Sequence, residues 1–323
     1  MQQPDPTTSE ATAAYHRLVT NVEHVIAGGA DAVRAAAVCL FAEGNLLLEG
    51  VPGVGKTMLA RALARSIGGE FSRVQATPDL LPSDLTGISV YDQSRQEFRF
   101  VPGPIFANVV LVDEINRTTP RTQSALLEPM EERQATVEGV THAMPSPYLL
   151  IATENPVEQH GTYPLPEGQL DRFALTVEVG YPGRDHAADI VRRQLVHHPI
   201  QDLEPVLTPG DVARHQHAVR EVHVDAAIVD YVVALVQASR AAPEVALGAS
   251  PRSMVALTRC AQARAIAEGR DFVLPDDVKA LAIAALAHRL IPRQARAGAG
   301  FGREVIRRIL SEVTVPLGIV GRG

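Results

Sequence analysis

The chain has no tryptophan, two cysteines and two lysines among its 323 residues, and the other 28 of its 30 basic residues are arginines. Cys39 and Cys260 lie far apart in the sequence, in apolar surroundings typical of helices. This pattern favours two buried thiols over a disulfide or a metal site. The scarcity of lysine makes Lys56, which lies in a glycine-rich segment, a prominent candidate for a specific role.

Long apolar runs are also missing. No stretch approaches the roughly 20 residues that would span a bilayer. The polar start MQQPDPTTSE does not have the basic and then apolar layout of a signal peptide. We therefore expect a cytoplasmic protein without membrane insertion.

The net charge of −7 is unevenly distributed. Residues 1–185 carry a net charge of −10, whereas residues 186–323 carry +3. An acidic first part offers no broad field for nucleic acid, so a nucleic-acid partner is not expected. The oppositely charged parts could meet between neighbouring subunits, although solvated surface charge explains the same split.

The pattern of apolar runs predicts an α/β fold. A chain of this length favours two domains. Apolar runs at 46–48, 109–112 and 148–152, alternating with helical segments, indicate a parallel sheet covered on both faces. Two insertions at 87–101 and 134–142 read as β-hairpins, and alanine-rich helices follow residue 183. We expect an α/β domain over residues 1–190 and a small helical domain over 191–323.

The segment LLLEGVPGVGKT at 46–57 fits the phosphate-binding loop pattern between a strand and a helix. Glycines allow the backbone N–H groups to curl around anionic oxygens at the positive end of the new helix. Lys56 can then reach the β- and γ-phosphates, and the Thr57 hydroxyl can ligate Mg²⁺. The predicted nucleotide-binding residues are Gly50, Val51, Pro52, Gly53, Val54, Gly55, Lys56, Thr57, Met58 and Asp113.

Two further strands end in polar residues at the same predicted edge of the sheet. VVLVDE ends in Asp113, placed to hold Mg²⁺, and Glu114, placed to polarise the attacking water. YLLIATENP ends in Glu154 and Asn155, and the Asn155 amide can hold that water without titrating. Asn before Pro is also an ordinary turn pair.

Three arginines are candidates for the γ-phosphate: Arg117 in DEINRTTP, Arg172 in EGQLDRF and Arg252 in GASPRS. A planar guanidinium suits phosphate and stays charged at any working pH. Ser250 and Pro251 predict a helix start that fixes the direction of Arg252. Each arginine could instead form a surface salt bridge, and for Arg117 the two alternatives weigh equally.

The order of these motifs resembles the MoxR family of AAA+ ATPases. GVPGVGKT, VPGPIFANVVLVDEINRTTPRTQSALLEPMEERQ, ATENP, GTYPLPEGQLDRF and SPRS carry the resemblance, which extends from about residue 20 to 315. It implies an AAA+ core with a C-terminal all-α lid, and insertions in helix 2 (87–101) and before sensor 1 (134–142). By position, Lys56 and Thr57 match Walker A, and Asp113 and Glu114 match Walker B.

The resemblance also assigns Asn155 to sensor 1, Arg172 to an arginine finger acting on the neighbouring subunit, and Arg252 to sensor 2 in the lid. The family is similar to magnesium-chelatase ATPase subunits. Its members form rings, typically hexamers, that bind MgATP between core and lid and act as chaperone-like machines in remodelling, maturation or metal insertion. Their usual partners carry von Willebrand factor A domains. Alternative hypotheses are a nucleic-acid-stimulated motor and a nucleotide-gated scaffold with negligible hydrolysis.

Two positions depart from the family pattern. Pro129 lies late in the helix after Walker B, where it removes an N–H bond to Ala125 and predicts that the helix bends or ends. Glu154 replaces an expected glutamine and puts a titratable carboxylate beside Asn155. Neither change touches a predicted phosphate contact, so ATPase chemistry is expected to survive.

Overall fold

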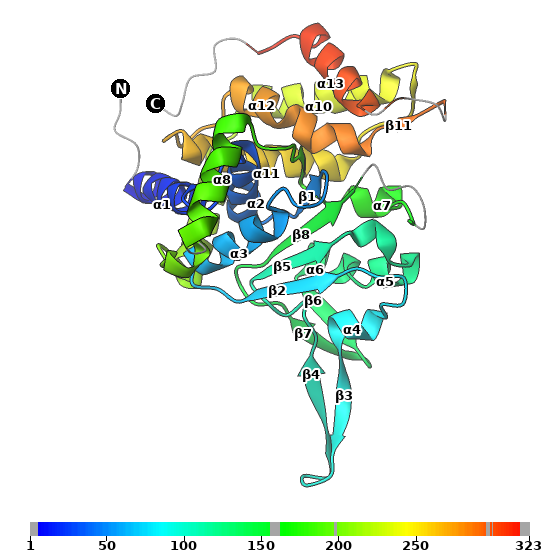
Figure 1. Ribbon diagram of the computed structural model, residues 1–323. Coiled ribbons are helices and arrows are strands. Elements are labelled where there is room, and N and C mark those ends of the chain that lie inside the picture. The colour runs from blue at the N-terminus through cyan, green and yellow to red at the C-terminus, as the bar shows by residue number, and fades with distance from the viewer. Residues whose placement is uncertain (1–5, 156–161, 197–198, 295–297, 299, 317–323) are drawn as a thin grey trace.

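A five-stranded parallel sheet, in the order β2-β5-β8-β1-β9, forms the centre of the molecule in a computed structural model that describes residues 6–155, 162–196, 199–294, 298 and 300–316 (Figure 1). Its strands are β1 (Leu46–Glu49), β2 (Phe71–Gln75), β5 (Val109–Asp113), β8 (Leu149–Glu154) and β9 (Leu175–Glu178). Pro156, the last residue of ATENP, and Gly161, the first residue of GTYPLPEGQLDRF, lie outside the described residues. The predicted strands of the parallel sheet are confirmed, and the structure adds β2 and β9.

The helices are α1 (Pro6–Glu23), α2 (Ala30–Phe41), α3 (Lys56–Ser66), α4 (Pro82–Thr86), α5 (Pro120–Ser124), α6 (Leu127–Glu132), α7 (Glu167–Leu170), α8 (Arg184–Val196), α9 (Pro209–Glu221), α10 (Ala226–Ala241), α11 (Pro251–Ala267), α12 (Pro275–Leu286) and α13 (Phe301–Glu312). Short 3₁₀ turns cover Ile115–Arg117, Pro199–Asp202 and Ala287–Arg289, and a small ribbon joins β10 (Val245–Leu247) to β11 (Ile291–Pro292). Of the described helices, none is long and apolar enough to cross a membrane.

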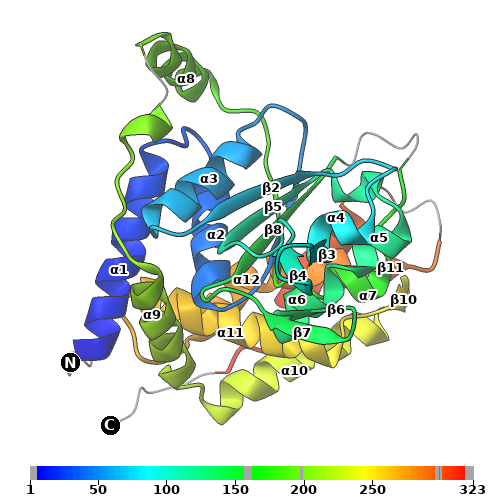
Figure 2. The ribbon, with the colours of Figure 1, turned by 90° about the horizontal axis from the view of Figure 1, so that it is seen from below.

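Side chains of alternate strand residues belong to two apolar clusters, one on each face of the sheet. Leu46 and Leu48 pack with α1–α3 and with the C-terminal helices, whereas Leu47 packs with α6 and the segment around Phe173. Figure 2 shows α1–α3 and α4–α7 on opposite sides of the sheet. The parallel sheet covered on both faces is therefore confirmed, and the lid helices share the apolar cluster of the first face.

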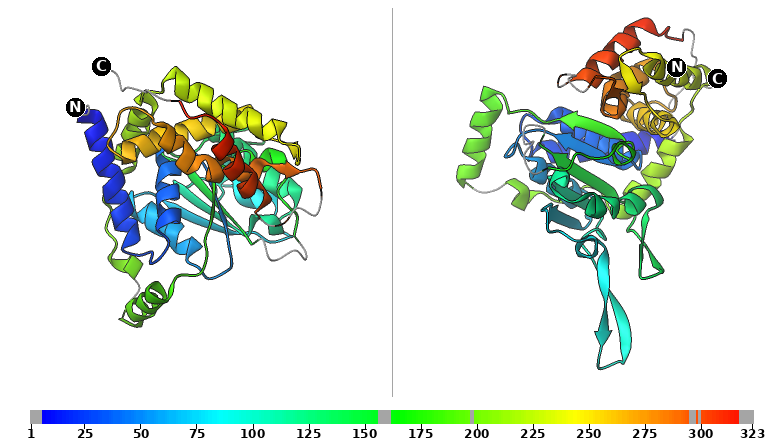
Figure 3. Two further views of the ribbon diagram at one scale, coloured as in Figure 1. Left: turned by 90° about the horizontal axis from the view of Figure 1, so that it is seen from above. Right: turned by 90° about the vertical axis from the view of Figure 1, so that its right-hand side faces the viewer.

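Two antiparallel hairpins leave this body, as predicted. The first pairs β3 (Gly87–Asp92) with β4 (Glu97–Pro102) and extends far from the sheet (Figure 3). The second pairs β6 (Gln134–Val137) with β7 (Val140–Ala143). Phe98 is 73% exposed on the first hairpin, but the Phe100 ring stacks on His142 of the second, with ring centroids 3.8 Å apart. Phe98 is therefore more accessible than Phe100.

The helix break near Pro129 lies one turn earlier than predicted. α5 ends at Ser124 and α6 begins at Leu127, so Pro129 lies in the first turn of a new helix. Proline is tolerated there because the first N–H groups of a helix have no intrahelical partner. The break between α5 and α6 therefore redirects the chain, and Pro129 costs the new helix no backbone hydrogen bond.

The C-terminal helices form a layer of their own above the sheet in Figure 1. The predicted domain division at residues 190 and 191 falls inside α8 and stays a prediction. Both cysteines are buried free thiols, as predicted, and Cys39 of α2 contacts Cys260 of α11. Burial raises the pKa of the Cys39 thiol.

Candidate functional site

The glycine-rich loop joins the carboxyl end of β1 to the first turn of α3. Gly53 and Gly55 have φ of 81° and 90°, and Gly55 is the N-cap of α3. A Cβ on Gly50 would lie 2.3 Å from the Val179 carbonyl oxygen, so only glycine fits between β1 and the chain leaving β9. The backbone N–H groups at the start of α3 are therefore available to an anion at the sheet edge.

Lys56 is the buried cation of this loop. Its side chain is 9% exposed, and Nζ donates a hydrogen bond to the Gly50 carbonyl oxygen at 2.6 Å. Burial lowers the pKa of Lys56, while the nearby carboxylates of Asp113 and Glu114 oppose that shift. The structure therefore brings Lys56 and the two predicted carboxylates together.

Thr153, on the neighbouring strand β8, orients both of those carboxylate residues. Its hydroxyl donates to Asp113 Oδ1 at 2.6 Å and accepts a bond from the Glu114 backbone N–H at 2.8 Å. Thr153 is fully buried, so this contact is shielded from water. Sequence reasoning did not select Thr153, although its position near the end of a predicted strand was the available signal.

Two arginines pair with the same acidic residues. Arg73 of β2 donates to Asp113 Oδ2 at 2.7 Å, and Arg117 Nε lies 2.9 Å from Glu114 Oε2. Gln75 donates a longer bond of 3.3 Å to Glu114 Oε2. Of the two alternatives for Arg117, the structure shows a salt bridge, and that salt bridge lies within the site.

Asn155 follows β8 at the same edge and is 5% exposed. Beside it, Glu154 aligns with Glu49 of β1, and Glu49 aligns with Glu178 of β9. Burial, and secondarily Glu49, raise the pKa of Glu154 to about 7. Arg303 of α13 donates to Glu49 at 2.9 Å and also bonds Glu178, so a lid residue reaches this edge.

A cavity of about 660 Å³ opens next to this edge. It lies between the α1–α2 connection and the chain that follows β9, with Ile26, Gly28, Val179, Tyr181 and His186 in its lining. Val179 connects the cavity to the loop, because its N–H donates to the Glu49 carbonyl oxygen at 2.7 Å. The sequence signal for the cavity was the glycine break at residues 28–29.

The other two predicted arginines lie at the opposite edge of the sheet. Arg172 precedes β9, and its carbonyl oxygen accepts a bond from Asn45, which precedes β1, at 3.3 Å. Both strands run parallel, so these residues mark the amino edge, whereas Lys56 follows the carboxyl edge. The Ser250 hydroxyl caps α11, as predicted, by accepting a bond from the Ser253 N–H at 3.2 Å.

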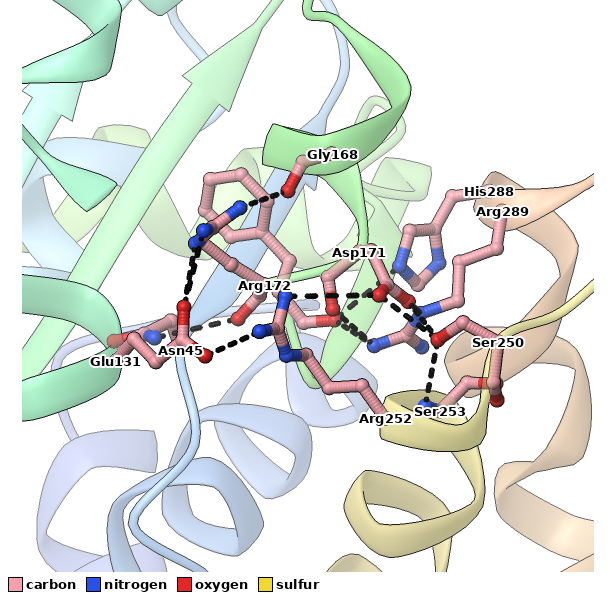
Figure 4. A network of polar contacts seen from close by, with 11 residues as sticks. Asn45, Glu131, Gly168, Asp171, Arg172, Ser250, Arg252, Ser253, His288 and Arg289 are labelled. Carbon is pink, nitrogen blue, oxygen red and sulfur yellow. Dashed lines mark hydrogen bonds and ion pairs between the residues drawn. The ribbon is translucent and has the colours of Figure 1, made fainter. Parts of the chain in front are cut away.

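Arg252, in the first turn of α11, lies beside Arg172 (Figure 4). Both pair with Glu131, and Arg252 Nη1 also lies 3.8 Å from Asp171. These acidic partners hold Arg252 at the amino edge, opposite the loop that carries Lys56. Arg303 is a lid arginine that lies at the carboxyl edge.

Known families and proteins match most of this chain. Residues 45–175 match the family described as "ATPase family associated with various cellular activities (AAA)", and residues 237–309 match the AAA lid domain. The chain is 48% identical over 302 residues to an uncharacterized protein, YeaC, of Bacillus subtilis, covering 93% of this chain and 94% of that protein. It is 42% identical over 310 residues to Chaperone MoxR1 of Mycobacterium tuberculosis, covering 93% and 82% respectively.

A more distant relative and a solved structure extend the comparison. Protein MoxR of Methylorubrum extorquens is 31% identical over 338 residues, with 95% of this chain and 96% of that protein covered. The crystal structure of a "putative ATPase" from Cytophaga hutchinsonii superposes with a TM-score of 0.89 at 35% identity, covering 96% of this chain and 97% of that one.

Proposed function

Because the chain belongs to the MoxR family of AAA+ ATPases, we propose that it binds MgATP at the carboxyl edge of its sheet and hydrolyses it in a ring of identical subunits. Arg172 and Arg252 of one subunit then complete the site of the next. The expected assembly is the hexamer implied by the family, working as a chaperone-like machine.

The observation that carries this proposal is the distribution of charged groups over the two edges of one sheet. Lys56, Asp113 and Glu114 lie at the carboxyl edge, and Arg172 and Arg252 lie at the amino edge. Strands of about five residues at roughly 3.3 Å each separate the edges by about 15 Å. An arginine side chain does not extend that far, which supports a site that these arginines enter from a neighbouring subunit.

The residues at the carboxyl edge suit a magnesium nucleotide. The cavity beside Val179 is large enough for a base and ribose, and it opens next to the loop that would hold the phosphates. Asp113 and Thr57 offer the hard oxygen ligands that Mg²⁺ prefers, and Thr153 fixes the Asp113 carboxylate. When bound, Mg²⁺ would neutralise charge that develops on the phosphate oxygens.

The remaining groups supply positioning and charge. Lys56 would leave the Gly50 carbonyl and bind the β- and γ-phosphates, because phosphate is the stronger acceptor. Glu114 would orient and polarise the attacking water, and Asn155 would hold that water without exchanging a proton. The trans arginines would stabilise charge on the transferred group, so hydrolysis would depend on assembly.

The proposed partner is a protein with a von Willebrand factor A domain, as the resemblance implies. The exposed Phe98 and the accessible turn near Gly139 offer contact points on the two hairpins. In the Glu114→Gln variant, replacing Phe98 with serine should weaken partner capture. In the otherwise wild-type protein, the same replacement should leave basal ATP turnover unchanged.

Mixed rings test the trans arrangement. Arg172→Ala subunits and Glu114→Gln subunits should each turn over ATP slowly, and their mixture should recover activity, because each supplies what the other lacks. Turnover is measured after light scattering confirms that both variants assemble. A mixture as slow as its components, in assembled rings, would argue against a trans arginine.

A further inference from the structure

Glu131, near the end of α6, is placed between the two arginines of the amino edge (Figure 4). Its Oε2 accepts from Arg172 Nε at 3.1 Å and lies 3.0 Å from Arg172 Nη2. Its Oε1 accepts a hydrogen bond from Arg252 Nη2. One carboxylate therefore joins two guanidinium groups that come from the core and from the lid.

Without a shared anion these two cations would repel each other. Groups bound to the two oxygens of one carboxylate lie within a few ångströms, and like charges at such separations disfavour one another. The Arg172 side chain is 20% exposed and that of Arg252 is 40% exposed, so both are partly open to a neighbour. Glu131 therefore allows two arginines to remain side by side on an accessible surface.

The contacts of Arg172 leave part of its guanidinium available. Two of its five N–H donors point to Glu131, and a third bonds the Gly168 carbonyl oxygen. Among the contacts of the described residues, two donors remain for another acceptor. Arg172 can therefore keep its bonds to Glu131 while it binds an oxygen anion of a second molecule.

A second, partly buried network links the segments that carry the two arginines. Asp171, which precedes Arg172, accepts one shared hydrogen bond from the Ser250 hydroxyl, whose oxygen lies 2.7 and 2.8 Å from the two carboxylate oxygens. Ser250 stands at the start of α11, the helix that carries Arg252. Arg289 is 6% exposed and donates to Asp171 Oδ1 at 2.9 Å and to the Phe173 carbonyl oxygen at 2.7 Å. These hydrogen bonds thus connect the segment before β9 to the start of α11.

We propose that Glu131 is a positioning residue that presents Arg172 and Arg252 together to the γ-phosphate bound by the neighbouring subunit. This inference rests on the trans arrangement of the proposed function and adds a residue that touches neither nucleotide nor Mg²⁺. Glu131 acts through the two arginines, so its removal misplaces both at once. It therefore matters only in the subunit that donates the arginines.

The test uses two kinds of subunit. Donor subunits carry Lys56→Ala, so they lack the loop lysine but retain both arginines. Acceptor subunits carry Arg172→Ala, so they retain the nucleotide residues but lack one arginine. In a mixture of the two, turnover should come from acceptor sites that face a donor.

Glu131→Gln is then placed in one kind of subunit at a time. In the donor it should lower kcat of the mixture by roughly 10- to 100-fold with little change in KM, because misplaced catalytic groups lose rate at about that scale. In the acceptor it should leave turnover unchanged, because that subunit already lacks Arg172 and so completes no active site in its neighbour. Loss of equal size in both placements, or no loss in the donor, would overturn the role of Glu131.

Glu132→Gln is the matched control. Glu132 is the next residue of α6, is exposed, and accepts a bond from the neutral Gln134 amide at 3.1 Å. Its replacement removes the same charge and should not affect turnover in the donor. Each variant subunit should unfold at about the same temperature as its parent subunit. An inactive parental mixture in assembled rings would reject the trans arrangement itself, and with it the role of Glu131.

Discussion

Glu154 and Glu49 lie directly opposite each other at the carboxyl ends of the neighbouring parallel strands β8 and β1. Glu49 shares Arg303 with Glu178, whereas the pKa of Glu154 is raised to about 7 by burial and by Glu49. Two carboxylates in register beside the phosphate-binding loop therefore carry less than two full negative charges near neutral pH. This arrangement would limit the repulsion of a nucleotide bound at this edge.

Replacing Glu154 with glutamine should stabilise the protein in a pH-dependent way. Between pH 4.5 and about 7 the folded state holds a proton that the unfolded state has released, so the stability of the wild type falls as pH rises through this window. Above about pH 7 the ionised carboxylate costs about 3 kcal/mol. Glu154→Gln should therefore gain up to about that amount at pH 8 and little at pH 5.

The measurement is urea unfolding of both proteins at the two pH values. Glu178→Gln, at the end of β9 on the far side of β1, controls for the loss of one negative charge. A difference between wild type and Glu154→Gln that is equal at pH 5 and pH 8 would contradict the raised pKa.

The pair of Arg73 and Asp113 should compete with Mg²⁺. The guanidinium neutralises the carboxylate oxygen that faces it at 2.7 Å, and the arginine is 46% exposed. An exposed pair is worth at most about 1 kcal/mol, or roughly fivefold in affinity. Arg73→Met should lower the Mg²⁺ concentration needed for half-maximal binding of a fluorescent nucleotide by up to that factor. Arg99→Met, on the exposed hairpin, should not, and an increased Mg²⁺ requirement for Arg73→Met would contradict the competition.

Loss of Arg289 should destabilise the fold. Its buried guanidinium bonds the Asp171 carboxylate and three backbone carbonyl oxygens, and Arg289→Met would leave the carboxylate without its main counter-charge. Breaking a buried pair from one side costs about 3–5 kcal/mol. The midpoint of chemical unfolding should fall accordingly, whereas Arg293→Met, at an exposed position, should stay within about 0.5 kcal/mol. Equal effects of the two changes would show that the Asp171 contact contributes nothing.

The nucleotide residues should separate binding from turnover. Glu114→Gln should bind ATP normally and lower turnover by about 100-fold or more, because it loses the group that polarises water. Lys56→Ala should lose ATP binding, since no other lysine is near the loop. Binding is followed by calorimetry and turnover by phosphate release. Wild-type turnover in Glu114→Gln would mean that another residue activates the water.

The sheet was predictable where strands are buried on both sides. Residues 109–112 and 149–152 form continuous apolar runs, and both strands lie inside the sheet. β2 and β9 form its two edges, and their mixed exposure leaves no apolar run to recognise. The edge strands were therefore missed, although Arg73 of β2 contributes to the site.

The sequence by itself determined the parts of the site that are local. The loop glycines, Lys56, and the polar residues that end β5 and β8 follow from short motifs in a strand-and-helix context, and both hairpins follow from turn residues between alternating runs. Parallel strands then bring those ends to one edge, because every strand of such a sheet points the same way.

Only the tertiary structure decided which arginine lies where. The contact of Glu131 with Arg252 spans 121 residues, and that of Arg289 with Asp171 spans 118. Long charged side chains leave no periodic pattern in a sequence, and their partners are chosen by packing between the core and the lid. That packing holds Arg252 beside Arg172 at the edge opposite Lys56, because Glu131 and Asp171 supply the charges that make the position stable.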